Sequence, residues 1–204
     1  MPIGTWHAWL GTYVGIVHVT MAALPVALLV VGALARWRRA SGSPAAWAWR
    51  ASAAEVGLVY GTLPWVWLTM LPGSEAGEVS GRVSLVPLRD LATMPAFQVV
   101  GNLLVLAALG FLGPVRFASL ASLRRVLVLA ATSSALIETA QYVLRLDRVS
   151  SVDDVLLNTA GAGLAALASR RWWRRRQPPG TRFACAPTTG PGAGGSWPTE
   201  RSWS

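Results

Sequence analysis

The sequence predicts an all-α membrane protein: a polytopic bundle of about five transmembrane helices, with its N-terminus outside and its C-terminus in the cytoplasm. The first observation is composition, because 53% of the 204 residues are hydrophobic and only 13% are charged, against roughly 25% charged residues in soluble domains. The second is a series of long apolar segments, and the third is the uneven placement of arginine between them. The lipid bilayer is therefore the first expected partner.

Five apolar segments are expected to form the spans, since a helix needs about 20 residues to cross the hydrocarbon core. They cover about residues 9–35, 52–71, 96–115, 126–144 and 155–173. The first lacks a basic n-region and a small-residue cleavage site, so we expect a retained helix and not a signal peptide. Pro64 is expected to kink the second helix. The polar loop 72–95 is long enough to carry structure of its own.

The arginines predict the orientation, because loops rich in Arg stay in the cytoplasm. Two connections and the segment after the fifth span are rich in arginine: Arg36, Arg38, Arg39 and Arg50, then Arg116, Arg124 and Arg125, then Arg170, Arg171, Arg174, Arg175 and Arg176. The alternate connections hold fewer: Arg82 and Arg89, then Arg145 and Arg148. Residues 1–176 are expected to form one membrane domain. Residues 177–204, rich in Pro, Gly, Ser and Thr, are expected to be a disordered cytoplasmic tail.

The sequence lacks the residues that several classes of function require. The net charge of +9 comes from arginines that flank apolar runs instead of forming one basic face, so nucleic acid is not an expected partner. Cys185 is the single cysteine, and His7 and His18 are the two histidines, so no disulfide or metal site is expected. The chain has no phosphate-binding glycine loop and no nucleophile elbow, and we expect no cofactor.

Polar residues inside the apolar segments are the candidate site. An intramembrane charge costs about 3 kcal/mol at the bilayer centre, and such residues commonly mark function. Those expected to meet in one pocket beneath the outer surface are Asn102, Glu138, Gln141, Asp154 and Asn158, with Arg148, Arg89 or Arg145 supplying positive charge. Structural roles stay open: Asp154 as a helix cap, Asn158 as an interhelical contact, and Glu138 as the partner of an arginine.

The motif LIETAQYVLRLDRVSSVDDVLLNTAGAG resembles the VanZ-like family of bacterial membrane proteins. Its pattern of Ile-Glu-x-x-Gln, an Arg-containing turn and Asp-x-x-x-Asn-x-x-Gly lies here at Ile137, Glu138, Gln141, Arg148, Asp154, Asn158 and Gly161. GNLLVLAALGFLGP is similar to the family's third-helix motif at Asn102, Gly110 and Phe111, and VSLVPLRDL is similar to its loop motif at Pro87. The similarity covers about residues 82–168. Ser84, Leu88, Leu106 and Ala108 depart from the family's usual Asn, Phe, Phe and Pro.

The resemblance implies a multi-pass protein of the bacterial plasma membrane with an envelope role, linked to resistance to glycopeptides of the teicoplanin type. Three functions stay open. The pocket, with Pro87 and Arg89 from the loop, binds a lipid-linked cell-wall intermediate, a glycopeptide or a membrane-protein partner. Alternatively, the chain is an intramembrane enzyme on a lipid-linked phosphate, with Glu138 and Asp154 as the acid–base pair. Thirdly, the bundle is purely structural. Small residues expected to permit close helix packing are Gly110, Gly161 and Ala165.

Overall fold

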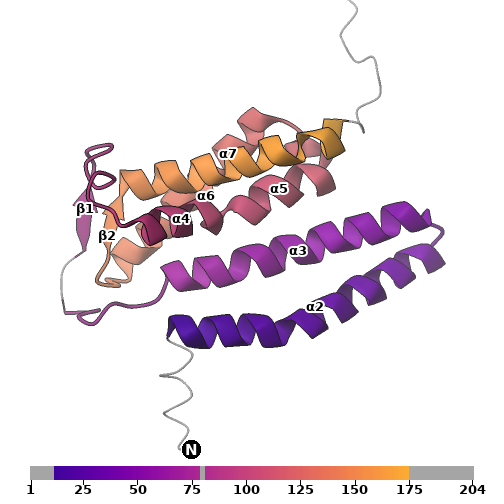
Figure 1. The fold of residues 1–204 in the computed structure, drawn as a ribbon, viewed down its shortest axis with the longest axis horizontal. Helices are drawn as coiled ribbons and strands as arrows, with labels where there is room; N and C mark the ends of the chain where they lie inside the picture. Colours follow the sequence, from indigo (N-terminus) through magenta and orange to yellow (C-terminus); the bar gives the residue numbers. More distant parts are fainter. Residues whose placement is uncertain (1–11, 79–80, 175–204) are drawn as a thin grey trace, which may run out of the picture.

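The fold is a helical bundle, as the composition predicts (Figure 1). The computed structural model describes residues 12–78 and 81–174, so the predicted tail lies outside the described residues. The helices are α2 (Tyr13–Ala40), α3 (Ala45–Thr69), α4 (Ala96–Val105), α5 (Ala107–Arg116), α6 (Leu123–Val143) and α7 (Val152–Arg174), with a 3-10 turn η1 (Ala118–Leu120). Each predicted apolar segment overlaps a helix. The third was expected to be continuous, but a break at Leu106 divides it into α4 and α5.

Capping residues and prolines account for several helix starts. The side chain of Thr12 accepts a hydrogen bond from the backbone N–H of Gly15 at 3.0 Å, which satisfies one of the free donors at the start of α2. Pro44 and Pro95 are the N-caps of α3 and α4. Because a proline disfavours helical conformation in the residue before it, the preceding chain turns there. Pro64 lies within α3, which continues to Thr69.

Three helical stretches in the described residues are long and apolar enough to cross a membrane: α2, α4 together with α5, and α6. Helices α3 and α7 are long enough but less apolar: α3 contains Arg50 and Glu55, and the first turn of α7 contains two adjacent acids. Large apolar side chains such as Leu28, Leu29 and Leu164 are exposed on the bundle surface, as expected for groups that face lipid. The number of five spans and the orientation stay predictions.

Helix α7 packs against α4, α5 and α6, while α2 packs on α3, which in turn contacts α5 (Figure 1). Small residues make these approaches possible. A Cβ at Gly110 would overlap the carbonyl oxygen of Ala162 in α7, and a Cβ at Gly161 would overlap that of Leu103 in α4. Close backbone packing of this kind holds helices together in lipid, where apolar burial between helices supplies little driving force. Ala165 is half-buried in α7.

A short two-stranded parallel sheet closes one end of the bundle, which the sequence did not predict. Strand β1 (Arg82–Ser84) pairs with β2 (Val149–Ser151), with Val83 opposite Ser150. We call this the strand end; it comprises residues 70–78 and 81–95, the start of α4, residues 138–151 and the start of α7. The opposite end, with the α2–α3 turn and the last turns of α5 and α7, is the arginine end (Figure 1).

Candidate functional site

The predicted polar residues lie toward the strand end, where Asn102 and Asp154 contact each other and the remaining ones have separate partners. Asn102 in α4 donates a hydrogen bond from its side-chain amide to the Asp154 carboxylate in α7. One turn further along α7, the Asn158 amide donates to the Ser134 hydroxyl of α6 at 2.7 Å. The Oδ1 of Asn158 is buried and has no partner among the described residues. These contacts join α7 to α4 and to α6 through polar groups that face the interior.

Glu138 is a buried acid held by strand β2 and not by an arginine. Its carboxylate accepts a hydrogen bond from the backbone N–H of Ser151 at 3.1 Å, and its carbonyl oxygen accepts one from the Ser150 hydroxyl at 2.9 Å. In the described part of the chain, the arginine–carboxylate ion pairs involve Glu55 and Asp147, and none reaches Glu138 or Asp154. Ion pairing of Glu138, an open structural reading of the sequence, is therefore not seen.

Gln141 and Arg148 form hydrogen bonds to backbone carbonyls at the end of α3. The Gln141 side-chain amide donates to the carbonyl of Thr69 at 2.9 Å, and Nε of Arg148 donates to the carbonyl of Leu71 at 3.1 Å. The Thr69 carbonyl belongs to the last turn of α3 and the Leu71 carbonyl lies just beyond it, so both bonds satisfy acceptors at the C-terminal end of the helix. Arg148 also lies within electrostatic range of the Glu138 and Asp154 carboxylates.

Asp153 organises the loop before α4, although the sequence reading chose its neighbour Asp154. Its side chain is 1% exposed. One carboxylate oxygen accepts from the backbone N–H of Leu88, and the other accepts from those of Asp90 and Leu91 at 3.0 Å each. Leu88 has a positive φ of 65°, a conformation that L-residues seldom adopt. The carboxylate thus holds a strained loop by its backbone.

Asp90 and Ser151 continue this polar network beside the sheet. The Ser151 hydroxyl donates to Asp90 at 2.8 Å and also accepts the backbone N–H of Asp153, so a serine caps α7. Hydrogen bonds from the Ser84 and Ser151 hydroxyls lower the pKa of Asp90 below its usual value. Two loop residues from the predicted site, Pro87 and Arg89, are exposed at their positions before Asp90.

Two cavities divide the predicted site, so the polar residues do not share one chamber. A cavity of about 270 Å³ is lined by Glu138, Ser150, Ser151 and apolar side chains of β1, α6 and α7. A second, of about 250 Å³, is lined by Asn102, Arg148 and Gln98 together with aromatic rings of α2, α3 and α4. Gln141, Asp154 and Asn158 line neither of these two cavities. Among the described residues, no three His, Cys, Asp or Glu side chains could hold a metal ion.

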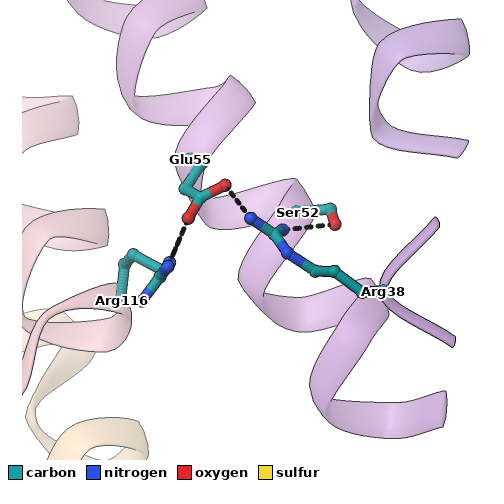
Figure 2. Close-up of polar contacts among 4 residues, drawn as sticks. All are labelled: Arg38, Ser52, Glu55 and Arg116. Carbon is teal, nitrogen blue, oxygen red and sulfur yellow. Dashed lines mark hydrogen bonds and ion pairs between the residues drawn. The ribbon is translucent and has the colours of Figure 1, made fainter. Parts of the chain in front are cut away.

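A second charged cluster lies away from the strand end, toward the arginine end. Glu55 of α3 pairs with Arg38 of α2 through one carboxylate oxygen and with Arg116 of α5 through the other, and Arg38 also donates to the Ser52 hydroxyl (Figure 2). The ring of Trp47 lies 5.9 Å from the Arg38 guanidinium carbon and 6.0 Å from that of Arg116. The sequence reading used both arginines only as markers of orientation.

Comparison with known proteins identifies the family. The family model described as VanZ/LLP1 matches residues 58–173, which is more than half of the chain and contains both cavities' polar residues. No curated protein and no solved structure matches the chain. The helical bundle, its membrane-compatible spans and the matched region agree with the resemblance carried by the motifs of α4, α6 and α7. The chain is a member of the VanZ/LLP1 family of membrane proteins.

Proposed function

We propose that the chain is an envelope protein of the bacterial plasma membrane whose strand end faces outward and binds a lipid-linked cell-wall intermediate or a glycopeptide. One observation carries the proposal: Glu138 is a buried carboxylate without an arginine partner among the described residues, and it borders a cavity of about 270 Å³. A buried acid in a membrane protein is costly. A purely structural role would favour a closed ion pair, whereas a binding role needs the open space.

The outward orientation is supported by charge. The connections at the arginine end carry most of the arginines, and such segments stay in the cytoplasm. The strand end would then lie on the side where cell-wall intermediates and glycopeptides are found. Its cavities combine apolar walls with a few polar groups, which is the usual composition of small-molecule sites.

The test compares Glu138→Gln with wild type in cells that express equal amounts of protein. We expect Glu138→Gln to reduce the teicoplanin resistance that expression of the protein confers. It should also reduce the difference in surface-bound fluorescent teicoplanin between cells that express the protein and cells that do not. Glu75→Gln is the matched control, because Glu75 is an exposed acid in the loop after α3. If Glu138→Gln and Glu75→Gln behave alike at equal abundance, the binding proposal is wrong.

The second candidate is an enzyme acting on a lipid-linked phosphate. Arg148 favours it, because only its Nε is engaged by the Leu71 carbonyl and the side chain lines the second cavity beside Asn102. A guanidinium with free donors suits a phosphate. Asp154 borders neither cavity but lies within electrostatic range of Glu138, where the two carboxylates could divide acid and base roles. Mass spectrometry of membrane lipids would decide: a lipid profile changed by wild type but not by Asp154→Asn supports catalysis.

A further inference from the structure

A long apolar cavity runs between α2 and α3, apart from the proposed site at the strand end. Its volume is about 500 Å³, and its walls include Ala23, Ala27 and Val30 from α2 with Val59 and Leu63 from α3. These helices lie along one side of the bundle (Figure 1). The family match begins at residue 58, so α2 lies outside it. The α2 wall of the cavity therefore lies outside the family match, while the α3 wall from Val59 to Trp67 lies within it.

The dimensions of the cavity select its occupant. Its lining on α2 extends from Val19 to Leu34, which at 1.5 Å per residue is about 22 Å. The volume divided by this length gives a mean cross-section of about 23 Å². A helix of about 10 Å diameter needs roughly 80 Å². The cavity is too narrow to enclose a further helix, whereas a single extended hydrocarbon chain fits within it and has the same apolar character.

One end of the cavity is charged. Glu55 belongs to its lining, and the guanidinium groups of Arg38 and Arg116 flank the Glu55 carboxylate (Figure 2). Two positive groups and one negative group leave a net charge of +1. Arg36 and Arg39 are exposed near this end of α2. Each guanidinium has five N–H donors, and the bonds to Glu55 and Ser52 use two on Arg38 and two on Arg116. Donors therefore remain for an anion.

We propose that this cavity binds one acyl chain of an anionic phospholipid, whose phosphate lies against the Arg38 and Arg116 guanidinium groups. The occupant comes from the leaflet at the arginine end, so the site is independent of the ligand at the strand end. The apolar walls take the hydrocarbon chain, and the net positive charge selects an anionic headgroup over a zwitterionic one. The lipid also covers apolar surface of α2 and α3 on both sides of the cavity.

Native mass spectrometry of the purified full chain tests the proposal. Phosphatidylglycerol and phosphatidylcholine with identical acyl chains are added in equal amounts. Wild type should retain phosphatidylglycerol at least about fivefold better, the effect of about one surface arginine on binding to anionic lipid. Ala27→Trp, which fills the cavity and leaves the charges, should remove this preference. Leu29→Trp is the matched control, since Leu29 is 73% exposed and lies outside the lining.

A second cavity-filling variant and a competition with a soluble anion complete the experiment. Ala23→Phe fills the same cavity one turn earlier and replaces Ala27→Trp if that variant does not fold. Glycerol phosphate has the headgroup chemistry without acyl chains, and it should not displace the lipid at equal concentration. The proposal is overturned if wild type retains both lipids equally, if the filled variants keep the preference, if Leu29→Trp loses it equally, or if glycerol phosphate displaces the lipid.

Discussion

Replacing Asp153 by asparagine should release the loop before α4 while the bundle stays folded. In the structure, one carboxylate oxygen accepts a hydrogen bond from the backbone N–H of Leu88, and the other accepts from those of Asp90 and Leu91. An asparagine of the same shape has one acceptor oxygen in place of two. At least one backbone N–H would therefore face the NH₂ group, a donor opposite a donor, and the remaining bonds would lose their charge.

The expected cost follows from these lost interactions. A hydrogen bond to a charged group contributes about 1.5–3 kcal/mol, and a buried donor left without a partner costs about 1–3 kcal/mol. The changes share one carboxylate, so they are not additive. We expect a total of about 3 kcal/mol in favour of opening the loop, which raises the population of the open loop roughly 100-fold. The positive φ of Leu88 adds to the tendency to open, because the bond to Asp153 holds this conformation.

Limited proteolysis with trypsin measures this opening, because Arg89 lies within the segment that Asp153 holds. Cleavage after Arg89, identified by mass spectrometry of the fragments, should be about 100-fold faster in Asp153→Asn than in wild type. Asp154→Asn is a closely matched control: it removes the same charge one residue away, but its carboxylate binds Asn102 and not the loop. Equal cleavage rates for the two variants would refute the assignment of the loop contact to Asp153.

Three further results are expected. Gly161→Ala should destabilise the protein by about 1–3 kcal/mol in thermal unfolding, because the new methyl group overlaps a carbonyl of α4, while Gly32→Ala, which has open space around it, should not. Asn158→Leu should cost only about 0.6 kcal/mol, the average of an interhelical hydrogen bond in a membrane, so a loss of function at full stability would assign Asn158 to the site. The lowered pKa of Asp90 means that its contribution to stability is complete above its unfolded pKa of about 3.9 and is lost as the pH falls through the lower folded value. Hydrogen exchange of the loop amides should therefore be protected at pH 5 and lose protection below about pH 4, and Ser151→Ala should raise the pH at which protection is lost.

The helices were predictable because their signal is local. Apolar runs of sufficient length mark α2, α4 with α5, and α6 by composition alone, and their expected bounds fall within a few residues of the observed ones. The small residues along the last span, Gly161 among them, predicted close approach of another helix without indicating which one. The β1–β2 pairing was not predictable, since each strand has three residues and neither shows a period.

The choice between the two adjacent acids shows where sequence reasoning fails. Asp154 was favoured because it lies four residues before Asn158 and so shares its face of the helix. The pattern indicates no role for Asp153, yet Asp153 is the more buried of the two. Its partners are backbone N–H groups 62–65 residues earlier in the chain. Every residue other than proline carries such a group, so no residue type in the loop indicates the contact.

Glu55 was missed for a related reason. It stands in an apolar helix, and its two arginines come from other helices, 17 and 61 residues away. Both arginines already had an explanation as markers of orientation, so no unexplained charge pointed to Glu55. A carboxylate in a predicted span nevertheless requires a partner. That requirement is the signal that points from Glu55 to the arginines flanking the spans.

The acids Glu138, Asp153 and Asp154 at the strand end have neutral hydrogen-bond donors, whereas Glu55 toward the arginine end has charged ones. At the arginine end, Glu55 is neutralised by guanidinium groups, which join α2, α3 and α5. At the strand end, Glu138 and Asp153 take backbone N–H groups, and Asp154 takes an amide. These neutral donors stabilise the acids without using Arg148 in an ion pair. Apart from its Nε–H, the Arg148 donors therefore remain for a ligand in the second cavity, and a salt bridge to either nearby acid would have used one or two of them.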